Sequence, residues 1–123
     1  MKTADFVATV FDGHSNPGKV TVAFTMALNA QKMGHSSIVL LMVEGVELGK
    51  PGATEGMDIG KPFEPVANLV KDYRAAGGRI GICGACMIHN GFTAEEMDPA
   101  YEIITAPEVV ELMMAAKGTM PIT

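Results

Sequence analysis

Short apolar runs and longer amphipathic runs alternate along the chain. The short runs are rich in β-branched and aromatic residues and predict strands at residues 5–11, 36–43, 79–83 and 101–105. The longer runs have helical spacing and predict helices at residues 17–34, 62–76 and 105–117, with a further short helix at residues 84–91. This repeated alternation predicts an α/β domain built on a parallel sheet. From Ile38 to Val43 every residue is apolar, which is typical of a strand covered on both faces.

Local signals indicate where several helices begin and end. Asn16 and Pro17 suit the cap and the first position of the first long helix, and Gly34 suits its end. The segments Thr93–Glu96 and Thr105–Glu108 have the spacing of a capping box. We therefore expect a helical turn to begin after each of these two threonines.

The helix expected at residues 62–76 has a regular apolar stripe. Phe63, Val66, Val70 and Tyr73 follow one another at spacings of three, four and three residues, so they fall on one face. We expect this stripe to pack on the sheet.

Two further segments are less regular. Residues 44–61 contain five glycines and are long for a loop in a compact domain, so we expect either a functional loop or a mobile surface excursion. Residues 118–123 offer at most a short fifth strand. Because no linker or internal repeat interrupts the pattern, we expect one domain over residues 1–123.

Composition narrows the class of protein. Hydrophobic residues make up 48% of the 123-residue chain, which excludes general disorder. The net charge of −5 argues against binding to nucleic acid or to an anionic membrane surface. The amino-terminal segment lacks the apolar core of a signal peptide, and no apolar run is long enough for a transmembrane helix. We expect a cytoplasmic protein with reduced cysteines.

Both cysteines, Cys83 and Cys86, lie at the end of the third expected strand, in "CGACMIHNG". Because loops after parallel strands gather at one edge of the sheet, His14, Glu44 and His89 are candidates to line the same site. Cys83 should begin a helix, whose free amides would favour its thiolate, whereas burial should disfavour the thiolate of Cys86.

The residues leave several chemistries open for the cysteine pair. His89 and His14 could complete a zinc site, although no second C-x-x-C is present, and we expect no bound metal or cofactor. The pair could instead form a reversible disulfide, or it could be two small buried residues. Covalent haem is excluded because Met87 occupies the position of the required histidine.

A phosphate-binding loop is also disfavoured. "GHSNPGKVT" approaches the P-loop pattern, but Val20 stands where the magnesium-binding hydroxyl belongs. We interpret this segment as an ordinary loop and helix start.

The cysteine segment resembles a known family. "CGACMIHNG" is similar to the CGxCMxxxG signature of the YchN-like branch of the DsrE/DsrF-like family, and residues 16–48 are similar to that family's first helix, second strand and following loop. The resemblance covers almost the whole chain. It implies a three-layer α/β/α domain with a parallel sheet of four to five strands, assembled as a homo-oligomer, a trimer or hexamer.

The resemblance also implies an activity. Members of the family relay sulfur as a cysteine persulfide, and spacing to Gly91 aligns their persulfide cysteine with Cys83. This implies a sulfur carrier or sulfurtransferase with Cys83 as nucleophile, Cys86 as resolving or supporting thiol, and sulfur-donor and sulfur-acceptor proteins as partners. The alternatives are a dithiol redox module or a non-catalytic subunit with structural cysteines. The second cysteine departs from the single one found in many members, and residues 118–123 are poor material for the family's final strand.

Overall fold

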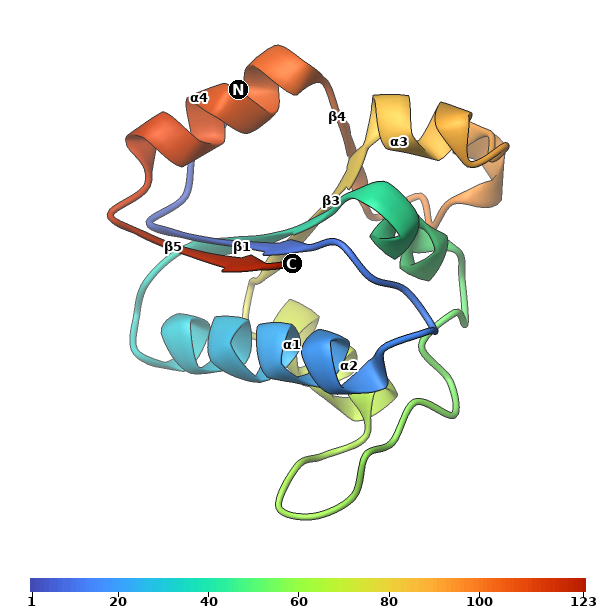
Figure 1. The fold of residues 1–123 in the computed structure, drawn as a ribbon. Coiled ribbons are helices and arrows are strands. Elements are labelled where there is room, and N and C mark those ends of the chain that lie inside the picture. Colours follow the sequence, from blue (N-terminus) through green and yellow to red (C-terminus); the bar gives the residue numbers. More distant parts are fainter.

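A computed structural model describes residues 1–123 and places five strands in one sheet (Figure 1). The strands are β1 (Phe6–Val10), β2 (Ser37–Leu41), β3 (Arg79–Cys83), β4 (Glu102–Ile104) and β5 (Gly118–Ile122). Their order across the sheet is β4-β3-β2-β1-β5, and every neighbouring pair is parallel. The carboxyl ends of all five strands therefore meet at one edge.

Helices cover both faces of this sheet. They are α1 (Pro17–Lys32), α2 (Val66–Ala75), α3 (Gly84–His89) and α4 (Ala106–Ala115), with the 3₁₀ helices η1 (Val43–Gly49) and η2 (Ala94–Glu96). Figure 1 shows α1 and α2 on one side of the sheet and α4 on the other. The structure thus has the three-layer α/β/α architecture that the sequence predicts. None of the helices combines the length and the apolar character needed to cross a membrane.

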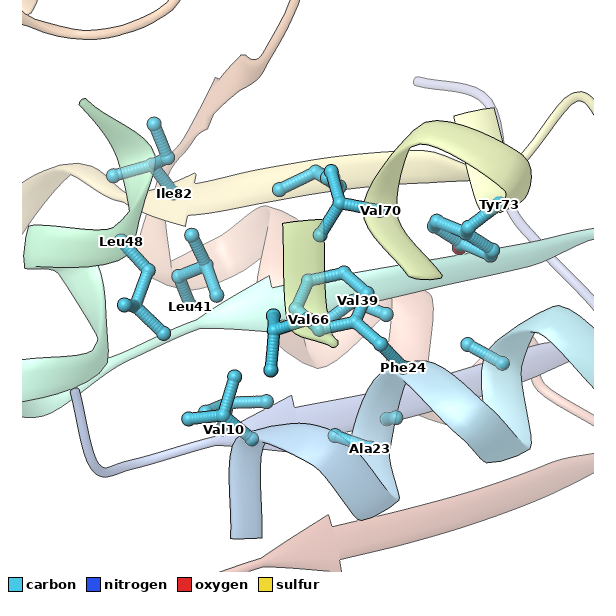
Figure 2. Packing of buried hydrophobic residues seen from close by; sticks show 14 of the residues in the cluster. Val10, Ala23, Phe24, Val39, Leu41, Leu48, Val66, Val70, Tyr73 and Ile82 are labelled. Carbon is cyan, nitrogen blue, oxygen red and sulfur yellow. The ribbon is translucent and has the colours of Figure 1, made fainter. Parts of the chain in front are cut away.

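The larger of two apolar cores lies between the sheet and the α1–α2 layer. Val10, Val39 and Leu41 point from the strands into this layer, where they meet Phe24 of α1 and Tyr73 of α2 (Figure 2). The rings of Phe24 and Tyr73 pack edge to face with centroids 6.0 Å apart, a favoured aromatic geometry. Every residue of β2 is buried, as its continuous apolar run predicts.

The core under α4 is much smaller. It contains six buried residues, compared with 21 in the larger cluster. Val7, Ile38 and Leu40 face α4 from the sheet, and Leu112 faces them from the helix. One helix, α4, therefore packs on this face of the sheet, whereas both α1 and α2 pack on the opposite face.

Several predicted helix ends are confirmed. The side chain of Asn16 accepts a hydrogen bond from the backbone N–H of Lys19 at 3.2 Å, and Pro17 is the first residue of α1. Thr93 and Thr105 each form a complete capping box, with Glu96 and Glu108 respectively. These features follow from local sequence because the interacting groups lie within three residues of one another.

Helix α2 begins four residues later than expected, at Val66. Pro65 is its cap residue, and a proline pushes the residue before it away from helical backbone geometry. Phe63 is therefore outside the helix and only half-buried, and the buried stripe of α2 is Val66, Leu69, Val70 and Tyr73.

The expected glycine-rich loop is partly ordered. Its first residues form η1, in which Val46 and Leu48 are buried in the larger core. Gly45 lies so close to the Val10 carbonyl oxygen that a β-carbon would overlap it, and Gly49 lies similarly close to the side chain of Ile82. The interpretation as a mobile excursion is therefore wrong for this part, and turns occupy residues 51–56.

The carboxyl-terminal segment forms a complete strand. All five residues of β5 pair with β1, from Phe6 opposite Gly118 to Val10 opposite Ile122. The segment contains Pro121, which is tolerated because β5 is an edge strand and an edge residue need not donate to a second neighbour. The expectation of at most a short strand underestimated this pairing.

Candidate functional site

The candidate site lies where β2 and β3 end at the carboxyl edge of the sheet. β2 runs into η1, and β3 runs into α3 without an intervening loop. In open parallel sheets this edge is the usual place for ligands, since the connecting loops converge there. Both cysteines lie in this region.

The two thiols differ in exposure. Cys83 is the last residue of β3 and the cap residue of α3, and its side chain is buried, with 7% of the residue exposed. Cys86 is half-buried on the first turn of α3. Both are free thiols. Cys86 is therefore the more accessible of the pair.

The helix start does not hold the Cys83 sulfur as the sequence suggested. The Cys83 side chain makes no capping hydrogen bond to the first amides of α3. The helix itself is only six residues long, so few aligned peptide dipoles act at its start. The structure therefore shows no contact between these amides and the Cys83 sulfur of the kind that the sequence suggested.

The environment of Cys86 favours its protonated form. Burial raises the pKa of the Cys86 thiol above its ordinary value, and a hydrogen bond to the Cys83 sulfur raises it further. The backbone N–H of Val43, which faces the Cys86 sulfur, opposes part of this rise. The raised pKa of Cys86 agrees with the effect that burial of the second cysteine led us to expect.

An open pocket of about 410 Å³ adjoins Cys86. It is lined by Val43, Glu44, Ala85, Cys86, His89 and Asn90. Three of the five residues predicted from the sequence are therefore together in one wall. Cys83 lies beneath the pocket and does not line it.

Sequence reasoning missed two residues that shape this pocket. Val43 has a φ of 54°, in the left-handed region that β-branched residues rarely adopt. Asn90 donates from Nδ2 to the carbonyl oxygens of Val43, at 3.2 Å, and of Cys86, at 2.8 Å. Asn90 therefore connects α3 to the turn after β2. A valine gives no sequence signal for left-handed backbone, whereas the Asn90–Gly91 pair signals only a helix end.

His14 does not line the pocket. Its ring Nδ1 lies 2.8 Å from Glu47 Oε1 and its Nε2 lies 2.6 Å from the carbonyl oxygen of Ala53. Its backbone N–H also donates to Glu47 Oε1 at 2.6 Å. His14 thus connects the loop after β1 to η1 and to the turns that follow, and contributes to the site only through these segments.

The segment that resembles a P-loop is an ordinary helix start. Lys19 pairs with Asp12 at 3.2 Å and donates to the Thr123 carbonyl oxygen at 2.6 Å.

The structure contains no group of three or more His, Cys, Asp or Glu side chains close enough together to hold a metal ion.

Comparison with known proteins places the chain in a family. The model of the DsrE/DsrF-like family matches residues 5–120. The chain belongs to the DsrE/DsrF-like family. This confirms the resemblance of the cysteine segment, which lies inside the matched range.

Solved structures share the fold of this DsrE/DsrF-like chain. The crystal structure of the YchN protein from Escherichia coli superposes with a TM-score of 0.74 at 15% identity, covering 98% of this chain and 99% of that one. The solution structure of Tm0979 from Thermotoga maritima gives a TM-score of 0.50 at 14% identity, covering 89% and 91%. The likeness to YchN shows that the two proteins share a fold over almost their whole length.

A relative by sequence is the uncharacterized protein MJ0760 of Methanocaldococcus jannaschii. It is 27% identical over 95 residues, which are 77% of this chain. The DsrE/DsrF-like chain spans about a third (34%) of the length of that relative.

Proposed function

We propose that the chain is a sulfur carrier that holds sulfane sulfur as a persulfide on the Cys83–Cys86 pair and passes it to an acceptor. The observation that carries this proposal is a pair of free thiols at the junction of β3 and α3, one of which forms part of the wall of an open pocket of about 410 Å³. Membership of the DsrE/DsrF-like family supports it. Sulfur-donor and sulfur-acceptor proteins are the proposed partners, in the reducing cytoplasm.

The pocket residues suit this chemistry. A sulfur carrier needs an accessible thiol, a side chain that accepts and returns the thiol proton, and hydrogen-bond donors that face the persulfide anion. Cys86 is reachable, and His89 and Glu44 line the same wall. The Val43 N–H faces the Cys86 sulfur. In the family's cysteine signature, the spacing to Gly91 makes Cys83 the counterpart of the persulfide cysteine, which supports Cys83 as the residue that carries the sulfur.

A dithiol redox module is the second candidate. The spacing of the two cysteines favours it, because Cys83 is the cap residue of α3 and Cys86 lies in the first turn, a spacing at which two cysteines can be bridged. A redox module is distinguished by a reversible loss of about 2 Da on oxidation, with a potential in the range of cellular thiol couples.

Intact-mass spectrometry after treatment with a persulfide donor tests the carrier function. We expect the reduced protein to gain about 32 Da, one sulfur atom, and to lose it again to a reductant. A variant with both Cys83→Ser and Cys86→Ser is the matched control and should gain nothing. If the wild-type protein takes up no sulfur at any donor concentration, the chain is not a sulfur carrier.

A further inference from the structure

The two thiols lie at different depths below the protein surface. Cys86 lines the pocket, whereas Cys83 belongs to the larger apolar core together with Met87 and Leu48. A donor molecule in the pocket therefore meets the Cys86 sulfur first, and reaches Cys83 only past the side chains of that core.

We propose that Cys86 takes the sulfane sulfur from a small alkyl persulfide in the pocket, and that Cys83 then receives the sulfur from Cys86 and stores it. This inference rests on the proposed function, and it assigns the order in which the two cysteines act. It reverses the order expected from the family alignment, in which Cys83 would meet the donor directly.

Loading is a transfer between sulfurs and needs no oxidant. The Cys86 sulfur attacks the outer sulfur of R–S–SH, so that a new S–S bond forms at Cys86 while the donor's S–S bond breaks and R–S⁻ leaves. The Cys86 thiol gives up its proton as it attacks. We assign to His89, which lines the same pocket, the role of accepting that proton and returning it to the leaving thiolate.

Storage is a second transfer of the same kind. The Cys83 sulfur attacks the outer sulfur of the Cys86 persulfide, giving the persulfide on Cys83 and the thiol on Cys86. The Cys83 thiol gives up its proton as it attacks, and the Cys86 sulfur takes up a proton as it leaves. Attack on the inner sulfur instead would release HS⁻ and leave a Cys83–Cys86 disulfide, with atoms and electrons again balanced.

Two features of the pocket fit Cys86 as the entry thiol. The backbone N–H of Val43 faces the Cys86 sulfur, where negative charge develops during attack. Asn90 holds the carbonyl groups of Val43 and Cys86 and so fixes the two elements relative to each other. A volume of about 410 Å³ is in the range of small-molecule sites, which favours a low-molecular-weight donor.

The test measures sulfur uptake by single variants, with glutathione persulfide as the probe. Intact mass gives the initial rate of the gain of about 32 Da, and cyanide gives the rate at which the bound sulfur is removed. The variants are Cys83→Ser and Cys86→Ser, with Cys86→Ala as an alternative if serine disturbs the fold. Ile88→Ser is the matched control, because Ile88 lies on the same helix but is 71% exposed and does not line the pocket.

Each variant has a distinct expected result. Cys86→Ser should load at least about tenfold more slowly than the wild type, while Ile88→Ser should load within about twofold of it. Sulfur on Cys83→Ser should be lost to cyanide at least about fivefold faster than sulfur on the wild type, because it cannot move inward to the buried position.

The outcomes separate this inference from the proposed function. If Cys86→Ser loads at the wild-type rate and Cys83→Ser does not load, Cys83 is the entry thiol and the inference is overturned while the carrier function stands. If sulfur on Cys83→Ser is as resistant to cyanide as sulfur on the wild type, the storage step is overturned. If the wild type takes up no sulfur, both fail together.

Discussion

The backbone of Val43 has a φ of 54°, where a β-branched side chain is crowded against its own main chain. Such strain persists only where the surrounding structure fixes the backbone. Here Asn90 donates a hydrogen bond to the Val43 carbonyl oxygen, and Gly45 packs closely against β1. The strained residue is also the one whose N–H faces Cys86. The position of this donor therefore has a cost in stability.

Relief of that strain should stabilise the protein. We expect Val43→Asn to raise the free energy of unfolding by about 0.5–1 kcal/mol, because asparagine tolerates left-handed backbone and Val43 is 39% exposed. Urea denaturation at fixed protein concentration measures the change. Val43→Ala is the control, since it removes the β-branch but keeps a β-carbon in left-handed backbone and should gain less, and a gain as large as that of asparagine would contradict the explanation.

Tyr73 links stability to alkaline pH. Burial raises its pKa from its ordinary value to about 12, and a hydrogen bond donated by Ser37 opposes part of this rise. Because the folded protein holds this proton more tightly than the unfolded chain, Tyr73 contributes stability that is complete below about pH 10 and is lost as pH rises toward about 12.

Tyr73→Phe should therefore flatten the alkaline loss of stability. Between pH 9 and pH 11 the wild type should lose about 1.3 kcal/mol more than the variant. At pH 7 the variant should be less stable by about 1–3 kcal/mol, because Ser37 and the Arg79 carbonyl lose a partner. Denaturation curves at the three pH values test both statements, and parallel losses in the two proteins would show that Tyr73 ionises as easily folded as unfolded.

The residues that the sequence predicted correctly act over short distances along the chain. Asn16 and Thr105 cap helices through groups three residues away, so their roles follow from local spacing. Cys86, Glu44 and His89 come together because parallel strands end at one edge, which the strand pattern predicts. His14 lies at the same edge, but a carboxylate 33 residues away along the chain holds it elsewhere, and no local pattern encodes that pairing.

At the scale of elements, η1 shows why one of the two alternatives for the segment after β2, a mobile excursion, is wrong for its first part. The glycines are compatible with a mobile loop, but Gly45 and Gly49 are there because η1 lies directly against β1 and β3. A glycine required by close packing and a glycine in a flexible turn look the same in sequence. Only the packing of Gly45 against Val10 and of Gly49 against Ile82 shows that these two glycines are required by close packing.

Gly45→Ala should consequently destabilise the protein. A β-carbon at Gly45 would overlap the Val10 carbonyl oxygen, which is backbone and cannot rotate away, so we expect a loss of about 1–3 kcal/mol. Gly18→Ala is the matched control, because its β-carbon would meet only Asn16 Oδ1 at an ordinary 3.6 Å. Urea denaturation compares the two, and equal stabilities would mean that η1 can move away from β1 freely.

At the scale of the whole molecule, the two faces of the sheet are covered unequally. The α4 layer buries a small core and leaves Val110 and Met114 60% and 82% exposed on one side of the helix. Ile103 of β4 is exposed as well, at 42%. Exposed apolar side chains gathered on one layer are typical of a surface that packs against another protein chain.

We therefore expect a homo-oligomer, a trimer or hexamer, that uses the α4 layer. Replacing Val110 and Met114 together by glutamate should dissociate it, because the assembly would have to bury two charges per chain. Light scattering at micromolar concentration measures the mass. Met33→Glu is the control, since Met33 is 73% exposed at the end of α1 on the other layer. A wild-type monomer would contradict the prediction, and so would an oligomer that survives the double substitution.

The position of β5 has a consequence for how the domain is made on the ribosome. β1 lies between β2 and β5, and Phe6 pairs with Ser37 on one side and with Gly118 on the other. During synthesis β1 and β2 can pair early, whereas the second edge of β1 stays open until the last strand has left the exit tunnel. The nascent chain therefore carries an unpaired apolar strand edge from the emergence of β1 until that of β5, and any delay before residues 118–122 emerge prolongs the period in which that edge can join a neighbouring chain.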